Sequence, residues 1–263
     1  MANDTCNSCE FNSSGNPRRS YVINSLGQKQ AVKYASVNDL ALFEGDIELG
    51  TAEEAEHFRE LVDSGGTGAT QAMAIIGEKY RWPNGIVPYV IAPNLPNQQR
   101  VTDAIAHWQL KTPLRFPLRT NETDYISFEI GNGCSSPVGR RGGKQVIHLA
   151  AGCLLGQTIH EIAHSVGMWH EQSRTDRDNY IEIKAANITP GYEFNFDKQT
   201  ANGFDIGEYD YGSIMHYPKN AFSKNGQDTI VAKGGQSIGQ RSGLSDKDVA
   251  GVKKIYPNLA WPP

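Results

Sequence analysis

The fold of this chain is decided by residues 160–171, which read His160-Glu161-Ile162-Ala163-His164-Ser165-Val166-Gly167-Met168-Trp169-His170-Glu171. If the first part is a helix, His160 and His164 lie one turn apart on the same face, where two imidazoles can bind one metal ion. Gly167 can adopt a left-handed conformation that ends the helix and turns the chain, so that His170 approaches the metal from another direction. We therefore predict one zinc ion per chain, bound by three histidines.

Glu161 follows the first of these histidines and would lie beside the metal without binding it. Three histidine ligands leave a coordination position open for water, and zinc lowers the pKa of such a water to about 7. A carboxylate at Glu161 can take the proton of this water as it attacks a polarised carbonyl. The short form H-E-x-x-H also occurs on polar helices that bind nothing, but the added glycine and third histidine favour a zinc peptidase.

Segments further along the chain carry a resemblance to a known family. Residues 211–217 read Tyr211-Gly212-Ser213-Ile214-Met215-His216-Tyr217, which resembles the methionine-containing turn beneath the zinc of metzincin peptidases. Residues 174–180 (RTDRDNY) and 237–241 (SIGQR), taken with His170 and Glu171, are similar to the astacin family in particular. The resemblance covers residues 73–256.

This resemblance implies roles for several residues around the metal. Tyr217 matches a movable fifth zinc ligand that would swing away to hydrogen-bond the oxyanion of the tetrahedral intermediate, although a packed core tyrosine is the alternative. Met215 would form a hydrophobic floor beneath the metal, and Glu171 would receive the buried amino terminus of the mature enzyme. We expect His216 to be structural, because the three-histidine site is complete without it.

Residues 1–72 are acidic, with 5 Lys and Arg against 11 Asp and Glu, whereas residues 73–263 have 20 against 18. Within the acidic part, residues 43–46 (FEGD) resemble the F-x-G-D element of astacin pro-segments, whose aspartate occupies the open position of the zinc. Asp46 would then be a metal ligand in the latent form only, and Gly45 would let the backbone approach the cleft. An ordinary acidic turn is the alternative. We predict a pro-segment over residues 1–72 and an astacin-like catalytic domain over residues 73–263.

The pro-segment also contains a predicted helix and a predicted cleavage region. Residues 51–54 (TAEE) read as a capping box, and the apolar stripe of the helix would consist of Ala55, Phe58, Leu61 and Val62. Residues 63–70 (DSGGTGAT) are typical of a flexible, protease-accessible linker, and we place the activation boundary near Met73. No Lys or Arg lies between Leu61 and Lys79, so we expect self-cleavage or an activating protease that does not require a basic residue.

The remaining sequence predicts a small α+β domain. Strands are expected at residues 86–91, 125–130 and 146–149, with Ile126, Phe128 and Ile130 on one face of the second. Helices are expected around Val101, Ile105 and Trp108, and from Ser245 to the residues before Pro257. The resemblance implies a metzincin (zincin) fold, in which a twisted sheet, mainly antiparallel at its edge, and the active-site helix form an upper subdomain. An irregular lower subdomain with a C-terminal helix would complete the cleft.

Two features bear on substrate binding. In the family, substrates lie extended against an edge strand, which by resemblance falls at residues 136–140, around Val138. Pro137 suits an edge strand because proline cannot donate to a ladder of hydrogen bonds. Main-chain pairing there would bind protein or peptide substrates with little regard to sequence.

Arg241 matches an arginine near the pocket for the residue after the cut, which would favour acidic residues. A structural arginine is the alternative.

The four cysteines permit three pairings. By resemblance Cys134 pairs with Cys153, which implies an oxidising compartment, while the second family disulfide has no counterpart. Cys6 and Cys9 lie in a polar tail, where a flexible segment with or without a local disulfide is favoured over a functional motif. The sequence opens with no secretory signal, but the disulfide and a latent protease favour a secreted protein, whose signal peptide is absent here, over one that is not exported.

Composition excludes some other classes. No apolar run is long enough to cross a membrane, and a net charge of −4 gives no reason to expect a nucleic-acid partner. The sequence therefore indicates a secreted, latent, monomeric zinc endopeptidase of the astacin type. Alternatives are another metzincin activity, a catalytically inert zinc-stabilised binding module, and a protein permanently inhibited by its pro-segment. Tyr217 and Glu171 argue against the first, and the presence of Glu161 and Asp46 argues against the second.

Overall fold

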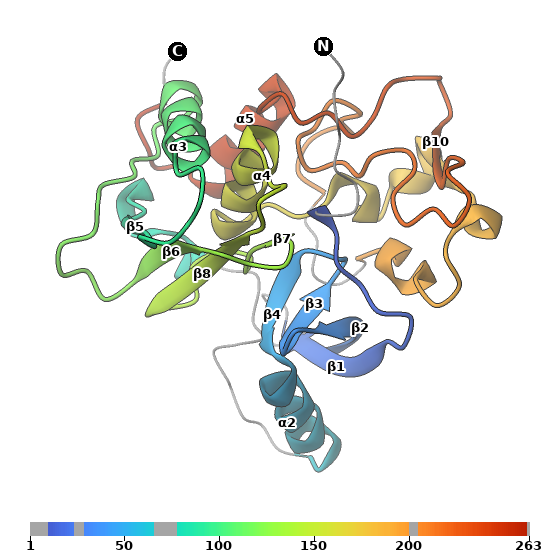
Figure 1. The fold of residues 1–263 in the computed structure, drawn as a ribbon. Coiled ribbons are helices and arrows are strands. Elements are labelled where there is room, and N and C mark those ends of the chain that lie inside the picture. Colours follow the sequence, from blue (N-terminus) through green and yellow to red (C-terminus); the bar gives the residue numbers. More distant parts are fainter. Residues whose placement is uncertain (1–9, 24–28, 66–77, 200–204, 262–263) are drawn as a thin grey trace.

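The computed structural model describes residues 10–23, 29–65, 78–199 and 205–261. The described chain forms a small sheet with one helix before residue 65 and a larger α+β body after residue 78 (Figure 1). Residues 66–77, which include the predicted linker and Met73, lie outside the described residues, as do Cys6 and Cys9. No helix in the described ranges is long and apolar enough to span a membrane.

The first sheet is antiparallel throughout. Its strands follow the chain order β1-β2-β3-β4, and they are β1 (Arg18–Ile23), β2 (Lys29–Val37), β3 (Leu40–Phe43) and β4 (Ile47–Thr51). In β2 the buried Val32 and Tyr34 flank the exposed Lys33, as the two-residue period of a strand requires. One face of this sheet therefore carries a hydrophobic core of its own, to which Val138 and Trp169 of the larger body also contribute.

Helix α2 (Ala52–Asp63) covers this sheet and confirms the predicted pro-segment helix. The Thr51 hydroxyl accepts a hydrogen bond from the Glu54 backbone N–H at 3.0 Å, and the Thr51 N–H donates to the Glu54 carboxylate at 2.8 Å. This reciprocal pair is the capping box that residues 51–54 predict. Ala55 and Phe58 of the predicted stripe are buried, whereas the last turn of the helix is only partly covered.

The second sheet has the order β5-β6-β8-β7 and is parallel except at its edge. Its strands are β5 (Tyr89–Ile91), β6 (Tyr125–Glu129), β8 (Lys144–Leu149) and β7 (Cys134–Ser135), the last of which is the antiparallel edge. All three predicted strands are present, but three boundaries were wrong, since β8 also begins two residues earlier than predicted, at Lys144. Ile86 makes only an isolated bridge to Arg115, and Ile130 is 49% exposed because the pairing of β6 with β8 ends at Glu129.

Two helices lie against this sheet and enclose the main core. They are α3 (Gln99–Lys111), whose Val101, Ile105 and Trp108 are buried as predicted, and α4 (Leu155–Ser165), which is buried from its second residue to its last. The Trp108 indole N–H donates to the backbone carbonyl of Ile159 in α4 at 3.2 Å, so the two helices are joined by a hydrogen bond as well as by packing. A helix that is buried all round can present polar side chains to an interior site.

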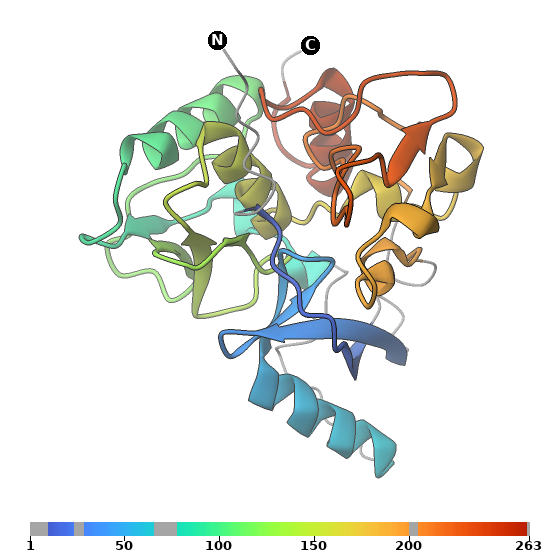
Figure 2. The same cartoon turned by 45° about the vertical axis from the view of Figure 1, so that its right-hand side comes forward.

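The second half of the body is largely irregular. Gly167 has a φ of 111° and turns the chain after α4. Four short 3-10 helices of the described chain follow this turn, namely η4 (Glu171–Ser173), η5 (Arg177–Asn179), η6 (Ala185–Asn187) and η7 (Glu193–Phe196). Two others, η2 (Glu78–Tyr80) and η3 (Pro83–Gly85), precede β5. Strands β9 (Ile181–Ile183) and β10 (Ile230–Ala232) form a two-stranded ladder, and α5 (Asp246–Ile255) is capped by Ser245 and ends before Pro257 as predicted. In Figure 2 this orange half lies beside the half with α3 and α4, with the first sheet below their junction. The arrangement is that of the expected α+β metzincin fold.

Candidate metal centre

The three predicted histidine ligands meet at one buried point. Each donates a hydrogen bond through Nδ1, so each presents the lone pair of Nε2. The acceptors are the Ile214 carbonyl for His160 (2.8 Å), the Met168 carbonyl for His164 (2.9 Å) and the Glu44 carboxylate for His170 (2.8 Å). Gly167 provides the turn that brings His170 back to the pair on α4. The chain thus builds a set of three oriented nitrogen ligands.

Asp46, in the turn before β4, faces these three nitrogens. Its carboxylate oxygens lie 3.2 Å from Nε2 of His160, 3.2 Å from Nε2 of His170 and 3.6 Å from Nε2 of His164. All four side chains are buried, and their ligand atoms lie within 4.8 Å of one another. The Nε2 lone pairs of the three histidines then face the carboxylate oxygens of Asp46. This arrangement needs a cation between the nitrogens and the oxygens. Three imidazole nitrogens and one carboxylate oxygen are a ligand set that zinc accepts, so these residues fit zinc.

The charge states of the histidines lead to the same conclusion. Burial lowers the pKa of His160 to about 3 and also lowers the pKa of His164, so both are neutral, as metal ligands must be. Burial acts in the same direction on His170, but the charges and hydrogen bonds of Asp46 and Glu44 outweigh it and raise its pKa to about 9. The centre therefore attracts one positive charge, which a metal ion can supply in place of a proton.

Glu161 lies on α4 directly after the first ligand and is fully buried. Neither carboxylate oxygen has a hydrogen-bond partner among the described residues. Burial, together with the charge of Asp46, raises the pKa of this carboxyl group well above its usual range. A carboxyl group that is buried, unpaired within the described chain and adjacent to a metal site has the properties required of a general base.

The predicted methionine turn lies against the same centre. Met215 is buried, and its carbonyl accepts a hydrogen bond from the Glu171 N–H at 3.2 Å. The Tyr217 ring centroid lies 4.8 Å from that of His170, and the Tyr217 hydroxyl donates a hydrogen bond to the Glu44 carbonyl. His216 Nδ1 donates a hydrogen bond to the Tyr217 carbonyl at 2.8 Å, and His216 Nε2 is hydrogen-bonded to the Tyr209 hydroxyl. Both ring nitrogens of His216 therefore have partners outside the metal site.

Glu171 lies beside a cavity of about 510 Å³ that His170 also lines. Its carboxylate accepts a hydrogen bond from the Asp210 N–H at 2.7 Å, and Arg174 lies 3.7 Å away. Burial raises the pKa of this carboxyl group to about 8, although the Asp210 N–H and Arg174 act against it. A cationic group that entered the cavity would ionise Glu171. The amino terminus predicted near Met73 lies outside the described residues.

The turn that carries Asp46 and the start of β4 cover the predicted substrate edge. The Ser136 N–H donates to the Asp46 carbonyl at 2.9 Å, and the Glu48 N–H donates to the Ser136 carbonyl at 3.0 Å, in the parallel direction. The residue that pairs through its backbone is thus Ser136, whereas Val138 is buried in the core of the first sheet. Gly45 has a φ of 81°, and a Cβ there would lie 2.8 Å from the Phe222 ring, so glycine is required for this approach.

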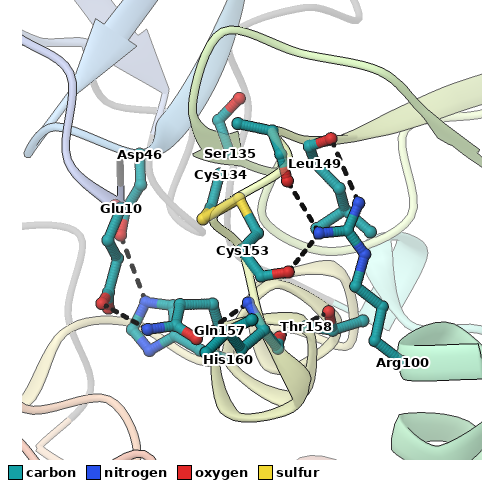
Figure 3. The surroundings of a disulfide bond; sticks show 12 residues. Glu10, Asp46, Arg100, Cys134, Ser135, Leu149, Cys153, Gln157, Thr158 and His160 are labelled. Carbon is teal, nitrogen blue, oxygen red and sulfur yellow. Dashed lines mark hydrogen bonds and ion pairs between the residues drawn. A yellow bond between two sulfur atoms is a disulfide. The ribbon is translucent and has the colours of Figure 1, made fainter. Parts of the chain in front are cut away.

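Arg241 lies near the metal centre but is already engaged. Its Nη1 donates to the carbonyls of Ile214 (2.9 Å) and His216 (3.1 Å), and its Nε donates to the Glu10 carboxylate at 2.5 Å. The same carboxylate accepts a hydrogen bond from Gln157, as Figure 3 shows. Sequence reasoning missed Glu10 and Gln157, because nothing in the local pattern around either residue indicates a partner far along the chain.

Two further contacts support the site. Glu48, which sequence reasoning also missed although it is only two residues after Asp46, accepts hydrogen bonds from the Ser135 hydroxyl (2.6 Å) and from His148 Nδ1 (2.6 Å). The predicted disulfide between Cys134 and Cys153 is present and joins β7 to the loop before α4 (Figure 3). The edge strand and the ligand-bearing helix are therefore held together covalently.

Comparison with known proteins gives consistent matches. Residues 74–257 match the family model named Astacin, which describes a family of peptidases. Zinc metalloproteinase nas-13 of Caenorhabditis elegans is 37% identical over 250 residues, which are 90% of this chain and 56% of that protein. Meprin A subunit beta of Homo sapiens is 39% identical over 226 residues, which are 82% of this chain and 30% of that protein.

A solved structure agrees with these matches. High choriolytic enzyme 1, a hatching enzyme zinc-protease from Oryzias latipes, has a TM-score of 0.63 and 37% identity, with 68% of this chain and 94% of that chain covered. The chain spans about half or less of the length of several curated relatives, for example 38% of Blastula protease 10 from Paracentrotus lividus. Because the family model covers most of the described body and these relatives are more than a third identical to the chain over the aligned residues, the chain belongs to the astacin family of zinc metallopeptidases.

Proposed function

We propose that this chain is a secreted, latent zinc endopeptidase that hydrolyses peptide bonds in proteins and is held inactive by Asp46 until its pro-segment is removed. One zinc ion would be held by His160, His164 and His170, and by Asp46 in the latent form. The observation that carries the proposal is the buried Asp46 carboxylate opposite the Nε2 atoms of the three histidines. Glu161 lies on the helix that also carries two of these histidines, and its carboxyl group has no hydrogen-bond partner among the described residues.

The side chains of the site can divide the chemistry between them. When bound, zinc supplies a Lewis acid that acidifies water and polarises the scissile carbonyl. Glu161 takes the proton of the attacking water and gives it to the leaving amine. The Tyr217 hydroxyl, freed from the Glu44 carbonyl when the pro-segment leaves, donates a hydrogen bond to the oxyanion. The backbone of Ser136 then pairs with an extended substrate, and Arg241 favours an acidic side chain after the cut.

Latency follows from the position of the pro-segment. Residues 1–72 would be released by a cut near Met73, made by the enzyme itself or by another protease, and the new amino terminus would enter the cavity beside Glu171. The relatives named zinc metalloproteinase and zinc-protease support the activity. The disulfide between Cys134 and Cys153 supports an oxidising, extracellular location, and we expect a monomer.

The test compares peptide cleavage by three forms of the protein: the full chain, the chain cut within residues 63–73 and separated from its pro-segment, and Glu161→Ala cut and separated in the same way. Zinc content is measured in each. We expect activity only in the cut wild type, with zinc in all three. Activity in the uncut chain would refute latency by Asp46, and a zinc-loaded but inert cut chain would favour the binding module. Amino-terminal sequencing of the cut product checks the boundary, and a start at Leu61 or Tyr80 would contradict it.

A further inference from the structure

Residues 10–15, here called the N-terminal strap, run between the two halves of the body before β1 begins (Figure 2). The Asn12 N–H donates to the Gly45 carbonyl at 2.9 Å, which joins the strap to the turn that carries Asp46. Further along, the Ser13 hydroxyl accepts from Asn195 Nδ2 at 3.1 Å, and the Ser13 carbonyl accepts from the Tyr192 hydroxyl at 3.3 Å. The strap therefore bonds both to the turn that carries Asp46 and to the irregular half of the body.

Glu10 begins the strap and is only 2% exposed. Its Oε1 accepts from Arg241 Nε at 2.5 Å and also forms an ion pair with Nη2 of the same arginine, while its Oε2 accepts from Gln157 Nε2 at 3.2 Å. Gln157 lies one turn before Glu161 on α4, so the carboxylate of Glu10 is seated next to the catalytic helix. A buried ion pair of this kind leaves a costly unpaired charge when one partner is removed.

Phe11 covers the neighbouring part of the site. Its ring centroid lies 4.6 Å from that of Tyr217, 5.8 Å from that of Phe222 and 6.5 Å from that of His170. These contacts place an apolar side chain over the tyrosine and the third histidine. The strap thus carries a charged contact and an apolar contact that are both separate from Asp46.

We propose that the strap is a second inhibitory anchor, in which Glu10 occupies the carboxylate subsite at Arg241 while Asp46 occupies the metal position. The proposal rests on the latency put forward above. A cut within residues 63–73 leaves the strap, Asp46 and the first sheet on one fragment, and that fragment has its own hydrophobic core. Cutting alone then does not open the cleft. Release of the pro-segment is a separate step whose rate Glu10 sets, and substrates with acidic side chains compete with Glu10 for Arg241.

The experiment measures how fast the pro-segment leaves the cut, zinc-loaded chain, using a fluorophore on the pro-segment and size-exclusion chromatography at successive times. Glu10→Gln keeps the shape of the side chain but removes its charge, and the matched control is Glu53→Gln, which removes an equal charge from an exposed position of the same fragment. Loss of one partner of a buried, hydrogen-bonded charge pair acts mainly on the dissociation rate, so Glu10→Gln is expected to release the fragment at least about 30-fold faster. Glu53→Gln should release it at the wild-type rate.

Two additional variants keep the proposal falsifiable if Glu10→Gln folds poorly, which thermal unfolding of the uncut chain would reveal. Arg241→Gln should accelerate release to a similar extent, and the double variant should be no faster than either single variant, because both remove the same pair. Equal release rates for wild type, Glu10→Gln and Arg241→Gln would overturn the anchor. Because release is measured without a substrate, a chain that shows these rates but stays inert after its pro-segment has been separated from it would refute the proposed peptidase function and leave the anchor intact.

Discussion

Gly156 offers a sharp test of how the metal-binding helix is positioned. Alanine is normally preferred to glycine inside a helix by about 1 kcal/mol, so Gly156→Ala would ordinarily stabilise α4. The structure predicts the opposite. A Cβ at this position would lie 1.9 Å from the Arg241 carbonyl oxygen and 2.6 Å from the Arg241 Cβ, whereas contacts under 3.0 Å do not occur for real Cβ atoms. The obstacle is backbone, so no side-chain rotation can relieve it.

The size of the effect follows from what must move. Either α4 or the Arg241 segment has to shift by about 1 Å, and overpacking of this kind costs about 1–3 kcal/mol. After subtraction of the helix-propensity gain of about 1 kcal/mol, we expect the free energy of unfolding to fall by up to about 2 kcal/mol. The shift also reaches the site, because the Ile214 carbonyl accepts hydrogen bonds from both His160 and Arg241. A misplacement of about 1 Å can cost about 100-fold in rate.

The assay is urea unfolding of the uncut chain, with kcat/KM measured after activation. Gly251→Ala is the matched control, since Gly251 is also a buried helical glycine, but its added Cβ would find the nearest atom, Ile206 Cγ2, at 3.9 Å. This control should be stabilised by up to about 1 kcal/mol. If Gly156→Ala proves as stable as Gly251→Ala and equally active, the close packing of α4 on Arg241 is not what positions the site.

Three other predictions concern the disulfide, the oxyanion and the pro-segment interface. Replacing Cys134 and Cys153 by serine removes a cross-link between residues 19 apart and should lower the free energy of unfolding by about 3 kcal/mol, read from the urea midpoint; an unchanged midpoint would count against it. Tyr217→Phe should reduce kcat of the cut enzyme by about 10²–10³ with little change in KM, and an unaffected kcat would return the tyrosine to a packing role. Burial acts to lower the pKa of His148, but the Glu48 carboxylate outweighs burial and raises this pKa. The contact therefore stabilises the uncut chain fully below the unfolded pKa of about 6.5. This stabilisation is lost as the pH rises through the folded pKa. Melting temperatures measured from pH 6 to 9 should therefore fall less steeply in His148→Gln, and identical slopes would assign the effect to another group.

The parts of the structure that could be predicted from sequence are those specified by nearby residues. The two ligands on α4 follow from their four-residue spacing, because helix geometry places such residues on one face. The turn to His170 follows from a single glycine. The capping residues of α2 and α5 likewise mark their own helix starts. Asp46 was found through a short motif, yet its place opposite the histidines depends on a contact across 114 residues that only the family resemblance could suggest.

The parts that were not predicted depend on packing between distant segments. Strand β2 did carry a readable signal, since Val32 and Tyr34 alternate with polar residues, and the pro-segment sheet could have been inferred from it. Glu10 had no such signal, because its partner Arg241 is 231 residues away. The need for glycine at position 156 is equally non-local, since it comes from a backbone segment that crosses the helix from elsewhere.

Part of the acidity of residues 1–72 has a physical explanation. Within the described part of this range four carboxylates are buried, and a buried charge is costly unless it is paired. Their partners on the body are Arg241 and Gln157 for Glu10, the metal-site histidines for Glu44 and Asp46, and His148 and Ser135 for Glu48. Asp46 differs from the others, because its oxygens face nitrogen lone pairs and need a cation at the centre to be held there. The other three are paired by groups that the body itself carries, so these buried carboxylates match basic and polar groups on the surface of the body that they contact.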